Sequence, residues 1–155
     1  TGNKFELRAV GSTANSSAPM TVLNAIVADQ LTKFKVDVDK LIKKGDKKDV
    51  ALLTVIKKYI KESKAIRFEG NGYSQEWADE AATRGLSNIK TTPKALDAYV
   101  SEKSTELFTK TNIFSKRELH ARHEILLESF FRKLQIEARV MGDVTNSQIL
   151  PAGTA

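Results

Sequence analysis

The chain has 155 residues, of which 41% are apolar and 28% charged, so it is long enough for one domain with its own core. Cysteine is absent, which excludes a disulfide framework and makes the cytoplasm the expected compartment. The net charge of +6 raises the question of nucleic acid or an anionic membrane as partner. The lysines of residues 33–64 lie among acidic residues, which is typical of the solvated side of a helical hairpin, and the sequence contains no nucleic-acid-binding motif, so nucleic acid is not expected. No run of 18 apolar residues is present, so no membrane span is predicted.

The first predicted element is a short strand near the start of the chain. Phe5 and Leu7 alternate with charged residues, which is typical of a half-buried strand that Gly11 then ends. On such a strand Glu6 and Arg8 share one face, roughly 7 Å apart. The pair is either a solvated strand face or an active-site face, in which Glu6 holds a metal and Arg8 holds an anion. Spacing alone does not choose between these two.

The next pattern predicts two helices joined by a tight turn. Apolar residues at steps of three and four indicate a helix from Pro19 to Lys44, with Gly45 just past its end. Asp46 is in position to cap a second helix over residues 47–64. Because so short a connection leaves no other route, the two helices are expected to form an antiparallel hairpin.

A glycine turn at residues 70–72 leads into a short helix, with Ser74 as its cap and Gly85 past its end. A turn of this kind can cradle an anion at the helix start. The Lys and Ser or Thr of a phosphate-binding loop are missing, so a plain turn is the preferred interpretation. Trp77, the single tryptophan, is predicted to be a packing anchor rather than a ligand platform.

Helix signals also mark the segment from Thr92 onward. Thr92 is the predicted cap of a helix whose first residue is Pro93, and Ser101 or Ser104 kinks or restarts it. Residues 111–114 are predicted to form a loop.

The last helix is predicted from a capping box formed by Ser115 and Glu118. It is expected to run to Met141, with Gly142 past its end. Its apolar stripe is wide, which favours a helix covered on two sides. This helix is therefore predicted to be the core of the helical unit.

Two histidines on this last helix raise a metal hypothesis, because His120, His123 and Glu124 have spacings that share a helix face. The His-Glu-x-x-His pattern is not met and no third strong ligand is near in sequence, so exposed or interface histidines are preferred. With two histidines and no cysteine, no Ser/His/Asp or Cys/His set can be assembled.

These patterns predict a mainly α fold, a bundle or hairpins of amphipathic helices following one short N-terminal β-strand. Two parts are expected: residues 1–18, with the strand and its loop, and the helical residues 19–155. Nothing in the chain's own residues completes an active site. One alternative is therefore a non-catalytic helical interaction module with a lysine-rich surface, whose weak binding would fall steeply with salt.

Several stretches resemble glutamine synthetase, and most closely its long type III form. The strand with its Glu-x-Arg pattern is similar to a late catalytic-domain strand shared by these enzymes in general. The other stretches are similar to the type III form. The stretches that carry the resemblance are Thr1-Gly2-Asn3-Lys4-Phe5-Glu6-Leu7-Arg8-Ala9-Val10-Gly11-Ser12, Pro19-Met20-Thr21-Val22-Leu23-Asn24, Ile66-Arg67-Phe68-Glu69-Gly70-Asn71-Gly72-Tyr73-Ser74, Arg84-Gly85-Leu86-Ser87-Asn88-Ile89-Lys90-Thr91-Thr92-Pro93 and Gln135-Ile136-Glu137-Ala138-Arg139-Val140-Met141-Gly142-Asp143.

The resemblance implies a ligase that joins ammonia to glutamate, using ATP through a γ-glutamyl phosphate. The strand would belong to a larger α+β catalytic domain, in a polypeptide that extends beyond both ends of this chain. Glu6 would bind a catalytic Mg²⁺ or Mn²⁺. Arg8 would be catalytic and substrate-binding, holding the transferring phosphate or the glutamate carboxylate. Many members continue this strand with an aromatic residue and Pro-Asp, where this chain has Ala9 to Ser12.

The resemblance also implies a cytoplasmic homo-oligomer, a double ring of twelve subunits. The helical residues 19–155 resemble part of the extra C-terminal region of the type III enzyme. They are expected to be structural and to help subunits assemble, and the isolated fragment is expected to be inactive.

Overall fold

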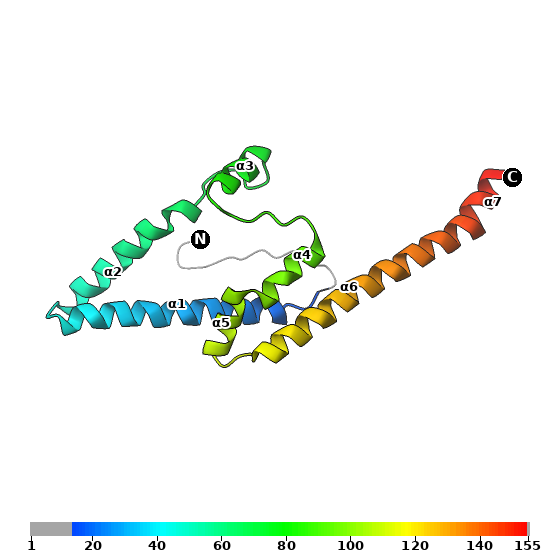
Figure 1. Cartoon of the computed structure of the whole chain (residues 1–155). Helices are drawn as coiled ribbons and strands as arrows, with labels where there is room; N and C mark the ends of the chain where they lie inside the picture. Colours follow the sequence, from blue (N-terminus) through cyan, green and yellow to red (C-terminus); the bar gives the residue numbers. More distant parts are fainter. Residues whose placement is uncertain (1–13, 155) are drawn as a thin grey trace. The chain divides into compact units, whose positions relative to one another are not determined.

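The computed structural model describes residues 14–154, and every regular element within them is helical (Figure 1). The prediction of a mainly α chain is therefore confirmed for the part described. The predicted N-terminal strand, with Glu6 and Arg8, lies outside the described residues. The division of the chain at residue 18 stays a prediction. The chain separates into two units, residues 1–67 and 68–155, and each is considered by itself.

The first unit contains the predicted helical hairpin. Its helices are α1 (Ser17–Lys43) and α2 (Lys48–Glu62), and a 3₁₀ turn, η1 (Ser63–Ile66), extends the second. Helix α1 begins two residues before Pro19, where the sequence pattern placed its first residue. Proline is tolerated there because the first turn of a helix has no intrahelical acceptors for its N–H groups.

The turn between α1 and α2 is a Schellman motif. The N–H of Gly45 donates to the carbonyl of Ile42 at 2.9 Å, and that of Asp46 donates to Leu41 at 3.2 Å. Gly45 has φ +105°, which only glycine adopts readily. The prediction that Asp46 caps α2 is wrong: the N-cap residue is Lys47, whose side chain makes no capping bond. The backbone of Asp46 instead closes the end of α1.

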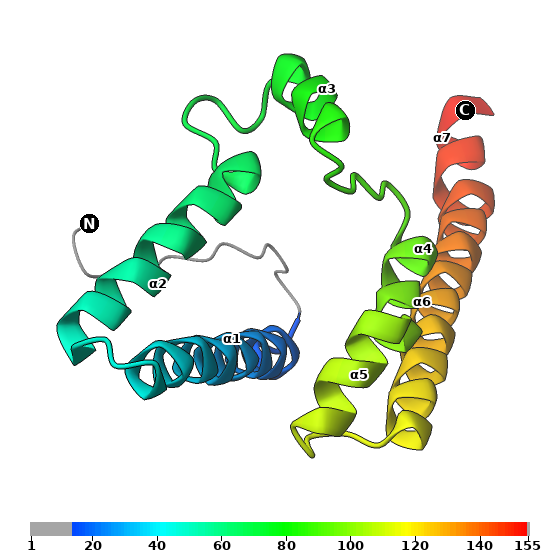
Figure 2. The same ribbon diagram turned by 60° about the vertical axis from the view of Figure 1, so that its left-hand side comes forward.

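The core of the hairpin lies close to this turn. Ala51 is fully buried, and its small side chain lets the two helices approach each other closely. Val38 from α1 and Val55 from α2 are buried beside it, and partly buried side chains surround these three: Phe34, Leu41, Leu52 and Tyr59. Away from the turn the two helices diverge (Figures 1 and 2).

The second unit begins with the glycine turn and short helix α3 (Gln75–Thr83). Ser74 is its cap, as predicted, and accepts a hydrogen bond from the N–H of Trp77 at 3.2 Å. Gly85 lies past its end with φ +74° and donates to Ala82, which confirms the predicted stop.

Three short elements follow: α4 (Thr92–Leu96), the 3₁₀ turn η2 (Asp97–Val100) and α5 (Glu102–Lys110). The predicted cap at Thr92 is wrong by one residue, since Thr91 is the N-cap and Thr92 is already helical. The predicted restart at Ser101 is confirmed, because its hydroxyl accepts from the N–H of Ser104 and caps α5. Residues 111–114 form a loop, as predicted.

The longest helix is α6 (Lys116–Val144), and the predicted capping box opens it. The hydroxyl of Ser115 accepts from the N–H of Glu118, and the carboxylate of Glu118 accepts from the N–H of Ser115 at 2.8 Å. The predicted stop at Gly142 is wrong. Glycine commonly ends a helix by adopting positive φ, and Gly142 does not adopt it. The helical path continues through a π-helical turn, η3 (Thr145–Ile149), into α7 (Leu150–Thr154).

The two halves of α6 have different surroundings. The first half packs against α4, η2 and α5, which lie beside it in Figure 2, and there Leu119 and Phe108 are buried. Every residue of α6 from 131 to 144 is exposed. The prediction that α6 is the core of the helical unit is therefore wrong over its second half. Residues 131–154 are called the C-terminal arm below.

Candidate functional site

The site residues predicted from the sequence, Glu6 and Arg8, lie outside the described residues, so their placement stays a prediction. Residues 14–154 contain three polar or aromatic groupings and one apolar groove.

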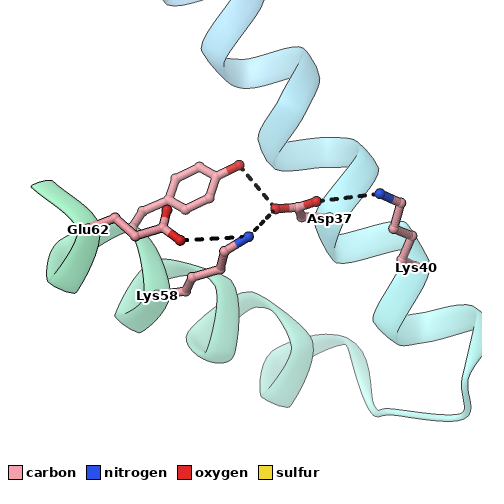
Figure 3. Close-up of polar contacts among 5 residues, drawn as sticks. Asp37, Lys40, Lys58 and Glu62 are labelled. Carbon is pink, nitrogen blue, oxygen red and sulfur yellow. Dashed lines mark hydrogen bonds and ion pairs between the residues drawn. The ribbon is translucent and has the colours of Figure 1, made fainter.

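The first grouping is a polar cluster between the helices of the hairpin (Figure 3). Its centre is Asp37 on α1. On α2, the ammonium of Lys58 donates to Asp37 Oδ2 at 3.0 Å, and the hydroxyl of Tyr59 donates to the same oxygen at 3.3 Å. Lys40 Nζ lies 3.8 Å from Asp37 Oδ1, and Lys58 Nζ lies 4.0 Å from Glu62 Oε1. One carboxylate thus receives groups from both helices.

The charges in this cluster keep Asp37, Lys58 and Tyr59 in the protonation states that their mutual hydrogen bonds need. The hydrogen bond from Lys58 lowers the pKa of Asp37, and the positive charges of Lys58 and Lys40 add to the effect. The same bond raises the pKa of Lys58. Burial, and then the negative charge of Asp37, raise the pKa of Tyr59. Near neutral pH the cluster is therefore a carboxylate, an ammonium and a neutral phenol.

This arrangement cross-links the hairpin and does not prepare a reactive group. Catalytic acids and bases have pKa values shifted toward neutral pH, whereas those of Asp37, Lys58 and Tyr59 move away from it. The Tyr59 ring also meets Phe34 edge to face, with 5.8 Å between ring centroids. The polar cluster and the apolar core therefore fix the same helix pair.

The second grouping contains one of the two histidines of the metal hypothesis. Nε2 of His123 on α6 lies 3.1 Å from Oδ1 of Asp97, the first residue of η2. His120 is exposed, and no group of three metal-binding side chains exists among the residues the structure describes. His123 therefore has a packing role, in which it ties α6 to η2.

The third grouping surrounds Trp77 in the α3 segment. The rings of Phe68 and Trp77 are stacked, with centroids 3.8 Å apart and planes 21° apart, and the Arg84 guanidinium lies 5.3 Å from the Trp77 ring. This geometry supports the predicted packing role of Trp77. At the same helix start, the N–H of Glu76 and the Ser74 hydroxyl lower the pKa of Glu76. The position where an anion would bind thus already has a carboxylate beside it.

The apolar groove lies on the C-terminal arm. Its volume is about 430 Å³. Apolar side chains dominate its lining, which comprises Ile136, Glu137, Val140, Met141, Val144, Thr145 and Ile149. The π-helical turn at residues 145–149 forms one end of it. π-Helical turns occur often at functional positions, where they change the direction of side chains.

Sequence reasoning missed the cross-helix partners and the groove. The pair of Asp37 with Lys58 follows from the hairpin register, which the Schellman turn fixes and which the apolar pattern alone leaves open. The groove depends on the π-helical turn, and no residue type in Thr145–Ile149 signals it. None of the helices in residues 14–154 combines the length and the apolar character that a membrane span requires.

Comparison with known proteins gives a family match, which the geometry of the described residues alone does not provide. The family model described as "Glutamine synthetase C-terminal domain" matches residues 51–155. A glutamine synthetase of Bacteroides fragilis is 48% identical over 97% of this chain, and a type-3 glutamine synthetase of Dictyostelium discoideum is 40% identical over 98%. A glutamine synthetase of Butyrivibrio fibrisolvens is 33% identical over 96%. The chain covers 21%, 20% and 21% of these relatives, so it spans about a fifth of their length.

Proposed function

The chain belongs to the glutamine synthetase family, and from that membership we propose that it is part of an ATP-dependent glutamate–ammonia ligase of the long type III form. The observation that carries the proposal is the 48% identity to one glutamine synthetase over 97% of the chain. Glutamate, ammonia and ATP are the proposed substrates, and the cytoplasm is the proposed compartment.

Within this proposal, Glu6 and Arg8 supply the chemistry that the chain contributes. A carboxylate suits a hard divalent cation, so Glu6 is proposed to bind Mg²⁺ or Mn²⁺. A guanidinium matches phosphate or carboxylate oxygens in pairs, so Arg8 is proposed to orient the transferring phosphate or the glutamate carboxylate. The described residues contain no group of three metal-binding side chains. The remaining ligands would therefore come from other parts of the full-length chain.

The experiment is a pair of substitutions in the full-length protein. Glu6→Ala is expected to abolish metal-dependent glutamine formation, because it removes a ligand oxygen of the metal. Arg8→Lys is expected to reduce it strongly, because an ammonium cannot replace the paired contacts of a guanidinium. Glu106→Ala is the matched control for the first substitution, since Glu106 is an exposed carboxylate on α5 outside the groupings described above.

The result that would contradict the proposal is full activity in Glu6→Ala. A wild-type protein that forms no glutamine, and binds polyanions with an affinity that falls steeply with salt, would favour the interaction module with a lysine-rich surface.

The helical residues 19–155 are proposed to support assembly of the subunits into a homo-oligomer. Among the described residues, twenty-five large apolar side chains are exposed and only six apolar residues are buried. So much exposed apolar surface is unusual in a protein whose surface is complete, and it favours cover by further protein. Deletion of residues 19–155 is expected to lower the number of subunits in the assembly, obtained by dividing the mass in solution by the mass of the shortened subunit. An unchanged number of subunits with unchanged activity would contradict this role.

A further inference from the structure

The glycine turn before α3 contains the single Asn-Gly pair of the chain, Asn71-Gly72. In such a pair the backbone nitrogen of the glycine can attack the side-chain amide of the asparagine, because glycine has no side chain to hinder the approach. Both residues are exposed, so water reaches them. The ligase proposal gives Asn71 no role. The pair is therefore examined for a chemical change in the chain itself.

The side chain of Asn71 is held in a position that activates its amide carbon. Its Oδ1 accepts a hydrogen bond from the N–H of Tyr73 at 3.1 Å. This Asx turn closes a ring of atoms that contains both Asn71 Cγ and the nitrogen of Gly72. The donor polarises the side-chain carbonyl, and it stabilises the negative charge that develops on Oδ1 when a nucleophile adds to Cγ. The turn thus prepares Cγ for attack by the neighbouring nitrogen.

The nitrogen of Gly72 is available as the nucleophile. Within the part of the chain that the structure describes, the N–H of Gly72 has no hydrogen-bond acceptor, so its proton can pass to water. A Cβ added at Gly72 would meet no heavy atom of a more distant residue within 4 Å. The backbone therefore has room to bring this nitrogen onto Cγ of Asn71.

We propose that Asn71 is a site of spontaneous modification, where the asparagine becomes a succinimide and then isoaspartate or aspartate. In the first step a bond forms between the Gly72 nitrogen and Asn71 Cγ, and the Cγ–Nδ2 bond breaks. Nδ2 leaves as ammonia and carries away the proton that the Gly72 nitrogen gives up. In the second step water opens the ring. Breaking the bond from the nitrogen to the main-chain carbonyl carbon gives isoaspartate, and breaking the bond to Cγ gives aspartate.

The modification is expected to loosen the start of α3. Isoaspartate lengthens the backbone by one atom after residue 71 and turns the main-chain carbonyl of that residue into a free carboxylate. In the unmodified chain this carbonyl accepts from the N–H of Ser74, the cap of α3, at 3.3 Å. The stacked rings of Phe68 and Trp77 lie on the two sides of the same turn in sequence. A longer turn therefore disturbs both the cap and the stack.

The first test follows the full-length protein during a long incubation in neutral buffer, with peptide mapping by mass spectrometry. The peptide that contains Asn71 is expected to gain the mass difference between a hydroxyl and an amino group, and fragmentation is expected to identify isoaspartate. Asn88 is the control within the same sample. It is also exposed and outside any helix, but the branched side chain of Ile89 follows it, so it is expected to stay unmodified.

The second test removes the freedom of the nucleophile and keeps the fold. Gly72 does not adopt positive φ and has open space at its Cβ, so Gly72→Ala is tolerated there. This variant is expected to lose most of the conversion of Asn71 over the same period. Gly142→Ala is the matched control, because Gly142 also has open space at its Cβ and lies far along the sequence. It is expected to convert as the wild type does.

The effect on α3 is measured by hydrogen exchange of the full-length protein before and after the incubation. The amides of residues 74–77 are expected to exchange faster in the aged wild type. The aged Gly72→Ala variant is expected to show no such change. Unchanged exchange in a wild type that has formed isoaspartate would contradict the loosening of α3.

Three outcomes would overturn the modification itself. In one, Asn71 stays intact in the full-length protein while a synthetic peptide of residues 66–76 converts, which would mean that the fold blocks ring closure. In another, Asn71 and Asn88 convert equally. In the third, aspartate forms without isoaspartate, which would mean direct hydrolysis by water. None of these outcomes depends on glutamine formation, so failure of the ligase proposal would be recognised separately, in the activity of the wild-type protein.

Discussion

The α1–α2 hairpin and the C-terminal arm both carry many apolar side chains, but these side chains are buried to different degrees. In the hairpin, Val55 is 2% exposed and a polar cluster around Asp37 joins the two helices. In the arm, Val140 is 53% exposed. Each helix of the hairpin covers the other because the tight turn at Gly45 folds the chain back on itself. An amphipathic pattern therefore predicts a helix with a face to bury, whereas the connections decide whether the same unit covers that face.

The largest expected effect comes from placing a charge at matched valines of the two regions. Val55→Asp is expected to lower the free energy of unfolding by about 3 kcal/mol or more, because it buries an unpaired carboxylate. Val140→Asp is expected to change it by less than about 0.5 kcal/mol in the 155-residue chain, since its side chain stays in water. Urea unfolding followed by circular dichroism measures both. Equal losses of unfolding free energy at the two positions would mean that the hairpin and the arm do not differ in burial.

A smaller effect is expected at the start of α6, where the covered half of this helix begins. Ser115→Ala removes the capping hydroxyl and is expected to cost about 1 kcal/mol. Ser129→Ala is the control, because Ser129 is an exposed residue in the interior of the same helix. Hydrogen exchange should become faster in the first turns of α6 and stay unchanged in the arm. A uniform change along the whole helix would mean that its two halves are not independent.

The smallest expected effect is a pH dependence confined to the hairpin. The pKa of Asp37 is lower in the folded chain than in the unfolded one, so the unfolded chain binds more protons as the pH falls through the ordinary aspartate range. The stabilisation from Asp37 is therefore present above that range and is lost as the pH falls through the lowered value. Asp37→Asn is expected to flatten the acid side of the stability profile.

The control for this prediction is Asp39→Asn, which changes a neighbouring aspartate whose carboxylate pairs with Lys35 on its own helix rather than with α2. It should leave the profile close to that of the wild type. If Asp37→Asn and the wild type lost stability in parallel from about pH 7 to about pH 3, the cross-helix pair would not hold the hairpin together.

Local signals in the sequence predicted much of the fold. The hairpin, the cap at Ser74, the restart at Ser101 and the capping box at Ser115 each depend on residues a few positions apart, and the structure confirms them. The errors at Asp46 and Gly142 share a cause. Each residue type suits a helix end, but the backbone at that position has another arrangement, which the residue type alone does not determine.

The candidate site depends on more distant parts of the protein. The roles of Glu6 and Arg8 were predicted from a resemblance to a known family. The residues that would act together with them would lie in parts of the full-length chain that this sequence does not contain. The exposure of the arm could not be predicted either, because a wide apolar stripe looks the same whether its own unit or another chain covers it. The stripe indicated a buried helix, and only the placement of α4 and α5 beside its first half showed where the cover ends.

The tight turn at Gly45 has a consequence for the time course of biosynthesis. Contacts between residues close in sequence form quickly, and domains fold as they leave the ribosome. Asp37 and Lys58 are 21 positions apart, so the hairpin can close soon after Lys58 is synthesised. The arm is synthesised some 70 residues later, and it would stay exposed until a folded partner covers it. Among the described residues, the apolar arm would thus be shielded after the hairpin, and it is a surface that a chaperone would cover in the meantime.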